Sequence, residues 1–225
     1  MTDPVPTRPA APPDGAELSF ECVDVRAEPY TAAPTLAFRL RIAETTGAAI
    51  HNIALRCQLR IQPRKRAYSD AEAAGLRDLF GERARFGDTL KPLRFADASL
   101  LVRPFRGTTE VDLPVPCGYD LEVAAGRYFH ALRDGEIPLL LLFSGTVFRK
   151  AAGGFAVDQI PWHKEAEFGL PVAEWRRMMD LHFPGSAWLR LRRETVDALG
   201  SFKSDAALLG WDDAVLELLR KAGRA

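Results

Sequence analysis

The residue types best suited to chemistry in this sequence are one histidine and two glutamates in a short segment. His163, Glu165 and Glu167 alternate along residues 162–167, so on an extended strand the three side chains would share one face. That arrangement predicts a metal or ligand site, or an acid/base cluster. We favour an exposed polar strand face, because His-x-Glu alone lacks the three protein ligands typical of catalytic zinc.

Other catalytic and cofactor motifs are absent from the sequence. It contains no Gly-x-Ser-x-Gly, no Walker-type phosphate loop, no His-Glu-x-x-His and no Cys-x-x-Cys. Cys22, Cys57 and Cys117 are an odd, widely spaced set in apolar surroundings, which is typical of buried free thiols in a reducing compartment. Cys117 is a candidate reactive thiol, but no partner histidine accompanies it. We therefore expect a cytoplasmic protein with no cofactor, and a binding protein rather than an enzyme.

A second candidate site is a cluster of arginines. Arg39 and Arg41 take the polar positions of one alternating stretch, and Arg56 and Arg60 take those of the next. Residues 44–50 between the two stretches contain a glycine, which predicts an antiparallel hairpin. On such a hairpin all four arginines share one sheet face, where facing like charges are destabilising.

Whether this arginine cluster is a structural feature or a binding surface depends on which acidic groups neutralise it. Glu110 and Asp112, on one face of a later stretch, are internal candidates, and an acidic surface of a partner protein is the external one. Thirty Lys and Arg balance thirty Asp and Glu, so the chain lacks the net positive charge of most nucleic-acid binders and nucleic acid is disfavoured as a partner. The longest apolar run, residues 137–143, is far shorter than the roughly 20 residues of a membrane helix. We expect no membrane insertion.

Stretches in which apolar and polar residues alternate predict a protein made mainly of strands. Pro114 and Pro116 place one of these strands at a sheet edge, and the apolar run 137–148 predicts a central strand covered on both faces. Ala152-Gly-Gly154 predicts a hairpin turn after it. The predicted strands are residues 18–22, 36–42, 53–61, 93–102, 108–115, 137–148 and 155–161.

Helical patterns interrupt and follow these strands. Ser69 and Glu72 have the spacing of a capping box, and Gly81 fits a helix C-cap, so one short helix is predicted between them. Residues 119–133 fit either a strand or a short helix. After Pro171 the apolar spacing becomes helical, with further helices predicted at residues 193–203 and 212–221. The Trp and Met residues of this part fit a core better than an interface; they are, with one leucine, Trp175, Met178, Met179, Trp188, Leu191 and Trp211.

These elements predict a mainly β (α+β) fold with three parts. Residues 1–16, rich in Pro and Ala, predict a disordered tail. Residues 17–170 predict an antiparallel β-sandwich with one inserted short helix. Residues 171–225 predict a C-terminal helical segment packed on the sandwich, where it would cover a sheet edge.

Five segments distributed over the chain carry a family resemblance. They are FECVDVR (residues 20–26), IALRCQLRI (53–61), GDTLKPL (87–93), PLLLLFSGTVF (138–148) and PWHKE (161–165). Together they resemble a family of uncharacterised bacterial proteins named only as a domain of unknown function. The resemblance implies one recurring module and transfers no catalytic residue. Genes of this family often lie near those of uptake nickel-iron hydrogenases in high-GC bacteria, which implies an accessory or assembly role.

The sequence thus predicts a non-catalytic accessory or protein-interaction module, with an assembly role for a redox enzyme such as a hydrogenase. Its partner would be a protein with an acidic surface, held by the arginine face or the helical tail. The alternative is an enzyme, or a small-ligand or metal-binding protein, with its site near His163, Glu165 and Glu167.

Overall fold

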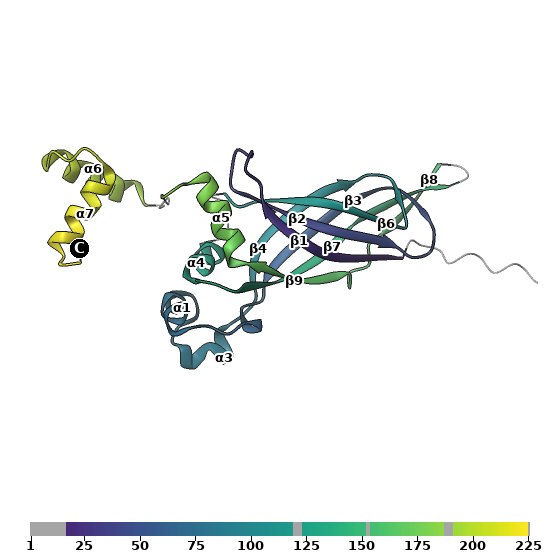
Figure 1. Cartoon of the computed structure of the whole chain (residues 1–225), viewed down its shortest axis with the longest axis horizontal. Coiled ribbons are helices and arrows are strands. Elements are labelled where there is room, and N and C mark those ends of the chain that lie inside the picture. Colours follow the sequence, from purple (N-terminus) through teal and green to yellow (C-terminus); the bar gives the residue numbers. More distant parts are fainter. Residues whose placement is uncertain (1–16, 119–122, 152–153, 187–190, 225) are drawn as a thin grey trace, which may run out of the picture. The chain divides into compact units, whose positions relative to one another are not determined.

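The computed structural model describes residues 17–118, 123–151, 154–186 and 191–224. Strands make up 42% and helices 32% of these residues, so the protein is α+β with more strand than helix, as predicted. The tail of residues 1–16, the first part of the ambiguous segment (119–122), the turn residues 152–153 and Trp188 lie outside the described residues. Figure 1 shows the arrangement of the elements.

Three antiparallel strands form the first sheet, which we call sheet A. Its order is β1-β2-β6, so β2 is central and β6 is an edge strand, as Pro114 and Pro116 predicted. A β-bulge interrupts the pairing of β1 with β2 between Cys22 and Asp24. The strands are β1 (Leu18–Ala27), β2 (Thr35–Glu44) and β6 (Thr108–Pro116).

Six antiparallel strands form the second sheet, which we call sheet B. Its main order is β4-β3-β7-β8, with β5 paired to β3 and β9 paired to β7. The long strand β7 therefore has neighbours on both sides, which confirms the central strand predicted from its apolar run. The strands are β3 (Ala49–Ile61), β4 (Leu93–Val102), β5 (Phe105–Arg106), β7 (Glu136–Ala151), β8 (Gly154–Gln159) and β9 (Glu165–Pro171).

The predicted hairpin between residues 36–42 and 53–61 is wrong. β2 belongs to sheet A and β3 to sheet B, and the connection between them crosses from one sheet to the other. In sheet A, β2 lies between β1 and β6, which place Glu21 and Glu110 opposite Arg41, a pairing that favours these neighbours by roughly a few tenths of a kcal/mol. Pairing β2 with β3 would have provided no carboxylates at the outward positions of β3, where Arg56 and Arg60 lie.

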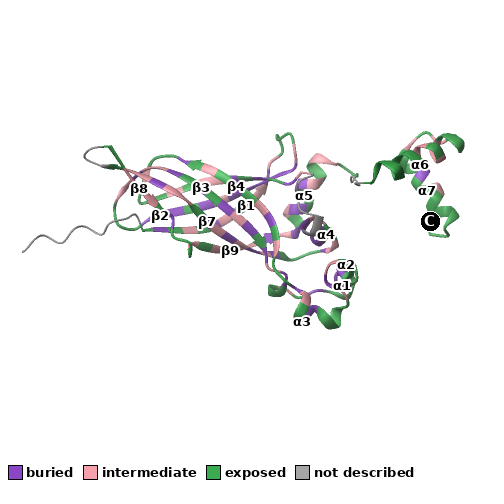
Figure 2. Ribbon diagram, turned by 180° about the vertical axis from the view of Figure 1, so that it is seen from behind, coloured by how far each residue is buried: buried purple, intermediate pink, exposed green. Residues whose placement is uncertain are grey.

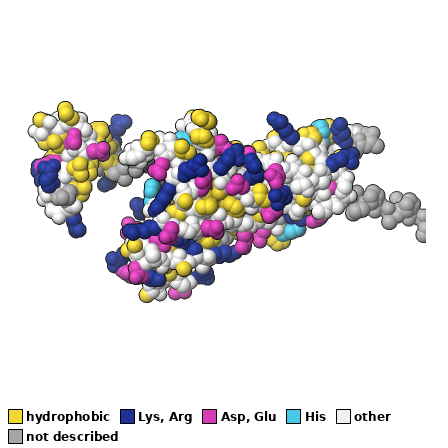
Figure 3. All heavy atoms as spheres, viewed as in Figure 1, with side chains coloured by type: hydrophobic (Ala, Val, Ile, Leu, Met, Phe, Trp, Pro, Cys, Tyr) yellow, Lys and Arg dark blue, Asp and Glu magenta, His cyan; other side chains and the backbone are white. Residues whose placement is uncertain are grey.

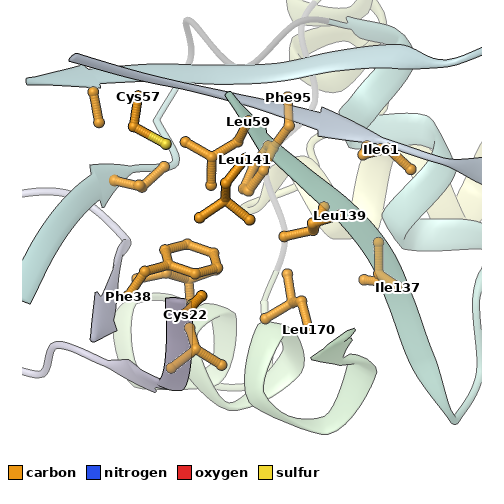
Figure 4. Close-up of a cluster of buried hydrophobic side chains, with 14 of the residues drawn as sticks. Cys22, Phe38, Cys57, Leu59, Ile61, Phe95, Ile137, Leu139, Leu141 and Leu170 are labelled. Atoms are coloured by element: carbon orange, nitrogen blue, oxygen red, sulfur yellow. The ribbon is translucent and has the colours of Figure 1, made fainter. Parts of the chain in front are cut away.

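The core lies between the two sheets. Phe38 from sheet A points toward Leu59 and Leu141 from sheet B (Figure 4), and all three side chains are almost fully buried. Phe20 of β1 stacks on Phe143 of β7 with 4.4 Å between ring centroids. Each buried side chain of this size stabilises the fold by about 1.5–3 kcal/mol relative to exposure, so the face-to-face packing holds the sandwich together.

Helices cover one end of the sandwich, in both views of Figures 1 and 2.

Where one short helix was predicted there are two, α1 and α2, separated at the buried Leu76. The predicted capping box of Ser69 and Glu72 is present. The ambiguous segment is helical from Val123. The elements at this end are η1 (Pro63–Lys65), α1 (Asp70–Gly75), α2 (Arg77–Phe80), η2 (Arg83–Arg85), α3 (Phe86–Thr89), α4 (Val123–Ala131) and α5 (Val172–His182).

The chain divides into two compact units, Met1–Pro184 and Gly185–Ala225. Helix α5 belongs to the first unit, where it packs on β1, β2 and β9 through Val172, Trp175 and Met178. The second unit contains α6 (Arg193–Asp205) and α7 (Trp211–Lys221), close to the predicted helices. Packing of α6 and α7 on the sandwich stays a prediction.

Candidate functional site

The outer face of sheet A holds two of the four arginines predicted to form a docking surface. Arg39 of β2 lies opposite Asp112 of β6, with 3.1 Å between Nε and Oδ1. Arg26 of β1 donates two further hydrogen bonds to the same carboxylate, of 3.1 and 2.9 Å. The guanidinium of Arg26, followed by that of Arg39, holds the pKa of Asp112 below its ordinary value. Arg26 also lies 2.7 Å from a carboxylate oxygen of Glu28, so two carboxylates neutralise the two cations within the fold.

Arg41 is neutralised in the same way. It lies between Glu110 of β6 and Glu21 of β1, and its guanidinium is 3.0 Å from a carboxylate oxygen of each. Figure 3 shows the general pattern, with Lys and Arg side chains interspersed with Asp and Glu over the sandwich. For Arg39 and Arg41, the prediction that Asp112 and Glu110 of the same chain neutralise them is confirmed.

The other two arginines, Arg56 and Arg60, lie on the outer face of sheet B. The prediction that all four arginines share one sheet face is therefore wrong, because it depended on the hairpin. Arg56 is exposed and lies between Ser99 of β4 and Ser144 of β7. Within the described part of the chain, its guanidinium has no ion pair and no hydrogen bond.

Arg60 lies further along the same face, with Gln58 between it and Arg56. Its cross-strand neighbours are Leu140 of β7 and Arg94 of β4, so it faces a like charge and an apolar side chain. Arg94 forms an ion pair with Asp97, whereas Arg60 has no carboxylate partner among the described residues. Sheet B thus leaves two cations on one strand without counter-charge.

A hollow of about 560 Å³ lies on this face of sheet B beside Arg56. Asp97 is the single carboxylate of the lining and accepts a hydrogen bond from the Gln58 amide at 3.2 Å, in addition to its pairing with Arg94. The lining residues are Arg56, Cys57, Gln58, Asp97, Ala98, Ser99, Leu142, Phe143, Ser144 and Trp162.

Trp162 of this lining lies in the loop between β8 and β9 and is 90% exposed. Backbone hydrogen bonds of 2.9 Å fix the loop to β7 at both ends, from Ile160 N–H to Gly145 O and from Phe143 N–H to Lys164 O. A single exposed apolar side chain is common on protein surfaces, but tryptophan is enriched in protein interfaces and this one lies beside the hollow. Sequence reasoning missed Trp162, although it lies within the PWHKE segment of the family resemblance.

The structure separates the three residues of the predicted ligand site. His163 lies in a turn, and the strand β9 begins only at Glu165. Glu165 and Glu167 do alternate on one exposed face of β9, but Glu167 is paired with Lys65. Among the described residues, no group of three or more His, Cys, Asp or Glu side chains is placed to hold a metal ion.

The three cysteines are buried free thiols, as predicted. Burial raises the pKa of each thiol to about 12. A thiol with such a pKa carries almost no thiolate at neutral pH, so the geometry disfavours Cys117 as a nucleophile.

A buried ion pair in the helical end of the sandwich was not predicted, although the capping box pointed to one of its members. Glu72 is 3% exposed and lies 2.9 Å from the guanidinium of Arg66. Burial alone would raise the pKa of Glu72, but hydrogen bonds from the backbone N–H groups of Arg133 and Ser69, together with Arg66, hold it below its ordinary value. Because every partner is internal, this pair is structural.

A second hollow, of about 570 Å³, lies on α5 and the loop before β7. Its cations are largely engaged, since Arg176 donates to the Leu132 carbonyl at 2.7 Å and Arg177 lies 3.8 Å from Glu174. The lining residues are Arg133, Asp134, Gly135, Ala173, Arg176, Arg177, Asp180 and Leu181.

The second compact unit exposes apolar side chains along its helices. Within its described residues, Ala214 is the one fully buried side chain, and Trp211 and Leu216 of α7 are about half exposed. In the first unit, by contrast, Trp175 and Met178 belong to the core, as predicted.

Fold and surface together define a β-sandwich protein with a helical end and a partly uncompensated basic sheet face. No helix in the described part of the chain is long and apolar enough to cross a membrane. The chain belongs to a family of unknown function, DUF6084, whose model matches residues 15–225. No curated protein matches the chain.

Solved structures that match the chain include two β-glucosidases. One, from Kluyveromyces marxianus, is 8% identical with a TM-score of 0.25 over 69% of this chain. The other, β-glucosidase 3B from Thermotoga neapolitana in complex with α-D-glucose, is 12% identical with a TM-score of 0.25 over 68% of this chain. This chain covers 15% and 17% of the two enzymes. At these TM-scores the likeness carries no argument about fold or function.

Proposed function

We propose that this chain is a non-catalytic protein-interaction module whose sheet B face docks on an acidic surface of a partner protein. The observation that carries the proposal is the absence of counter-charge for Arg56 and Arg60 within the described residues. The arginines at the corresponding outward positions of sheet A, Arg39 and Arg41, both have carboxylate partners.

Electrostatics supports this assignment. Arg60 faces Arg94 across the strands, and like charges placed opposite each other destabilise a sheet. A carboxylate-rich partner surface would relieve that repulsion and accelerate association. Such binding weakens with salt, because the Debye length falls from about 10 Å at 0.1 M to about 3 Å at 1 M.

The family resemblance supports a finer statement about the partner. The resemblance implies a gene neighbourhood with uptake nickel-iron hydrogenases, and on that basis we propose that the partner takes part in the assembly of a redox enzyme such as a hydrogenase. An accessory role of this kind needs a binding face and no catalytic group.

The test is capture of partners from the native host by the tagged protein, with mass spectrometry of the proteins that co-elute. We expect a stoichiometric partner at about 0.1 M salt that is lost at about 1 M salt. The double variant Arg56→Gln/Arg60→Gln should lose the partner, and the matched control Arg39→Gln/Arg41→Gln should keep it. Equal capture by both double variants would overturn the proposal, and partners unrelated to redox enzymes would overturn the finer statement.

The alternative of an enzyme or a metal or ligand site near His163 gains no support from the geometry. Glu167 is paired with Lys65 and His163 lies outside the strand that carries the two glutamates. Metal analysis of the purified protein tests it directly, and a stoichiometric metal lost in His163→Ala would favour it over docking.

A further inference from the structure

The hollow beside Arg56 indicates what kind of partner element the sheet B face receives. We propose that it binds a linear segment of the partner chain, which presents an acidic side chain to Arg56 and an apolar side chain to Trp162. This inference rests on the proposed function and names the recognition element within it.

Charge is the first part of the argument. Asp97, the carboxylate in the lining, is paired with Arg94 and accepts from Gln58, so its charge is compensated within the fold. Arg56 has no such compensation among the described residues. The net charge offered to a ligand is therefore that of one guanidinium, which prefers carboxylate, often through two parallel hydrogen bonds.

Hydrogen-bonding groups beside the guanidinium are the second part. Ser99 and Ser144 lie directly opposite Arg56 on the two neighbouring strands, one on each side. Both are exposed, and neither hydroxyl has a partner in the described residues. Serine hydroxyls can donate to carboxylate oxygens, and their small size leaves room around the guanidinium. The row Ser99, Arg56, Ser144 thus offers donors for both oxygens of an acidic side chain.

The indole of Trp162 is the third part. Its loop is fixed to β7 at both ends by backbone hydrogen bonds, so little backbone entropy is lost when a ligand packs on the indole. Tryptophan and arginine are among the residues that carry most of the binding energy in protein interfaces. A ligand that uses both needs an acidic and an apolar group on one flexible backbone, as a peptide segment has.

The shape of the site favours a segment over a flat surface. The hollow of about 560 Å³ is open to solvent, and the side chains of Arg56, Ser99, Ser144 and Trp162 around it are exposed, so it is a shallow groove on the sheet face. A flat, folded partner surface would pass over a concavity of this size without filling it. A few residues of extended chain would fill it and place their side chains on Arg56 and Trp162.

The experiment is selection of a random peptide library displayed on phage against the full chain, followed by titration of the enriched peptides by fluorescence polarisation. We expect enriched peptides to share an acidic residue near an aromatic or large aliphatic one. Arg56→Gln and Trp162→Ala should each weaken binding about thirtyfold, as loss of a hot-spot side chain does. Arg39→Gln serves as the matched control and should bind as the wild type does. Circular dichroism verifies that each variant is folded.

Two results would overturn the inference. One is the failure of any acidic-apolar peptide to enrich, and the other is enriched peptides whose affinity is unchanged in Arg56→Gln and Trp162→Ala. If host partners are still lost with Arg56→Gln/Arg60→Gln in that case, the docking face stands and recognises a folded surface instead. If peptides bind as predicted but host capture does not depend on Arg56, the proposed function fails separately.

Discussion

The two outer faces of the sandwich use arginine in opposite ways. On sheet A, Arg39 and Arg41 of the central strand are each paired with carboxylates of neighbouring strands. On sheet B, Arg56 and Arg60 of β3 have neither ion pair nor hydrogen bond in the described structure. The same alternating pattern in the sequence therefore yields a neutralised face in one sheet and an uncompensated one in the other.

The neighbouring strands decide this difference. β2 lies between two strands that place acidic side chains at the matching positions, Glu21 on one side and Glu110 and Asp112 on the other. β3 lies between strands that offer Ser99 and Ser144 at the level of Arg56. The role of an outward arginine therefore depends on its cross-strand partners more than on its own segment.

The largest effect we predict concerns the strand pairing below the sheet B hollow. Gly145 has φ +139°, and a side chain there would overlap the backbone carbonyl oxygen of Ala54 on β3. Gly145→Ala should therefore lower the free energy of unfolding by about 3 kcal/mol, through strain and a displaced strand. Chemical denaturation measures this change.

Gly47→Ala is the matched control, since Gly47 also has positive φ (83°) but open space around it. It should cost only about 1 kcal/mol, the backbone penalty alone. Equal losses for the two variants would mean that β3 and β7 do not approach each other as closely as described.

A smaller effect is expected from removing the charge that neutralises sheet A. Asp112→Asn should lower the free energy of unfolding by about 1 kcal/mol at neutral pH, a value kept low because solvent screens this partly exposed cluster. The folded-state pKa of Asp112 is depressed, so its stabilisation is present above the unfolded pKa of about 3.9 and is lost as pH falls through the folded pKa.

The difference between wild type and Asp112→Asn should therefore shrink as pH is lowered below about 4. Urea denaturation at several pH values measures it. Asp180→Asn is the control, because exposed Asp180 has no ion pair in the described part of the chain. A difference that persists unchanged to low pH would show that Asp112 acts through packing rather than charge.

The smallest effect we predict is a difference in stability between two single-arginine variants. Arg39→Gln should lower the denaturation midpoint, because it removes one of the two guanidiniums that neutralise Asp112. Arg56→Gln should leave the midpoint unchanged, since no contact is lost within the described fold. A loss of stability in Arg56→Gln as large as that in Arg39→Gln would reveal an internal partner for Arg56 and remove the basis for docking.

Local patterns predicted most of the fold. Period-two alternation and the apolar run 137–148 located most of the strands but not β5 or β9, and the capping box of Ser69 and Glu72 located the start of α1. Pairing between distant strands could not be obtained in this way, because the alternation in β2 and in β3 fits any partner. The partner strand β6, with Glu110 and Asp112, lies about 70 residues further along the chain than Arg39 and Arg41, beyond the reach of any local pattern.

The candidate site was predictable only in its separate parts. Arg56 was identified by its outward position, but the hollow needs Ser99 and Ser144 from two other strands. Trp162 is a single tryptophan in a loop, and its sequence neighbours do not show that it is 90% exposed. The site near His163 stays a prediction, and its assumption of one continuous strand does not hold, because β9 begins two residues later, at Glu165.

The most direct test of the contrast between the two faces is nuclear magnetic resonance of the arginine side chains in the free protein. Hydrogen exchange at guanidinium N–H groups reports whether each group is held in an ion pair. We predict slow exchange for Arg26, Arg39 and Arg41 and fast exchange for Arg56 and Arg60, with the last two protected once a partner binds. Equal exchange rates on the two faces would contradict the account.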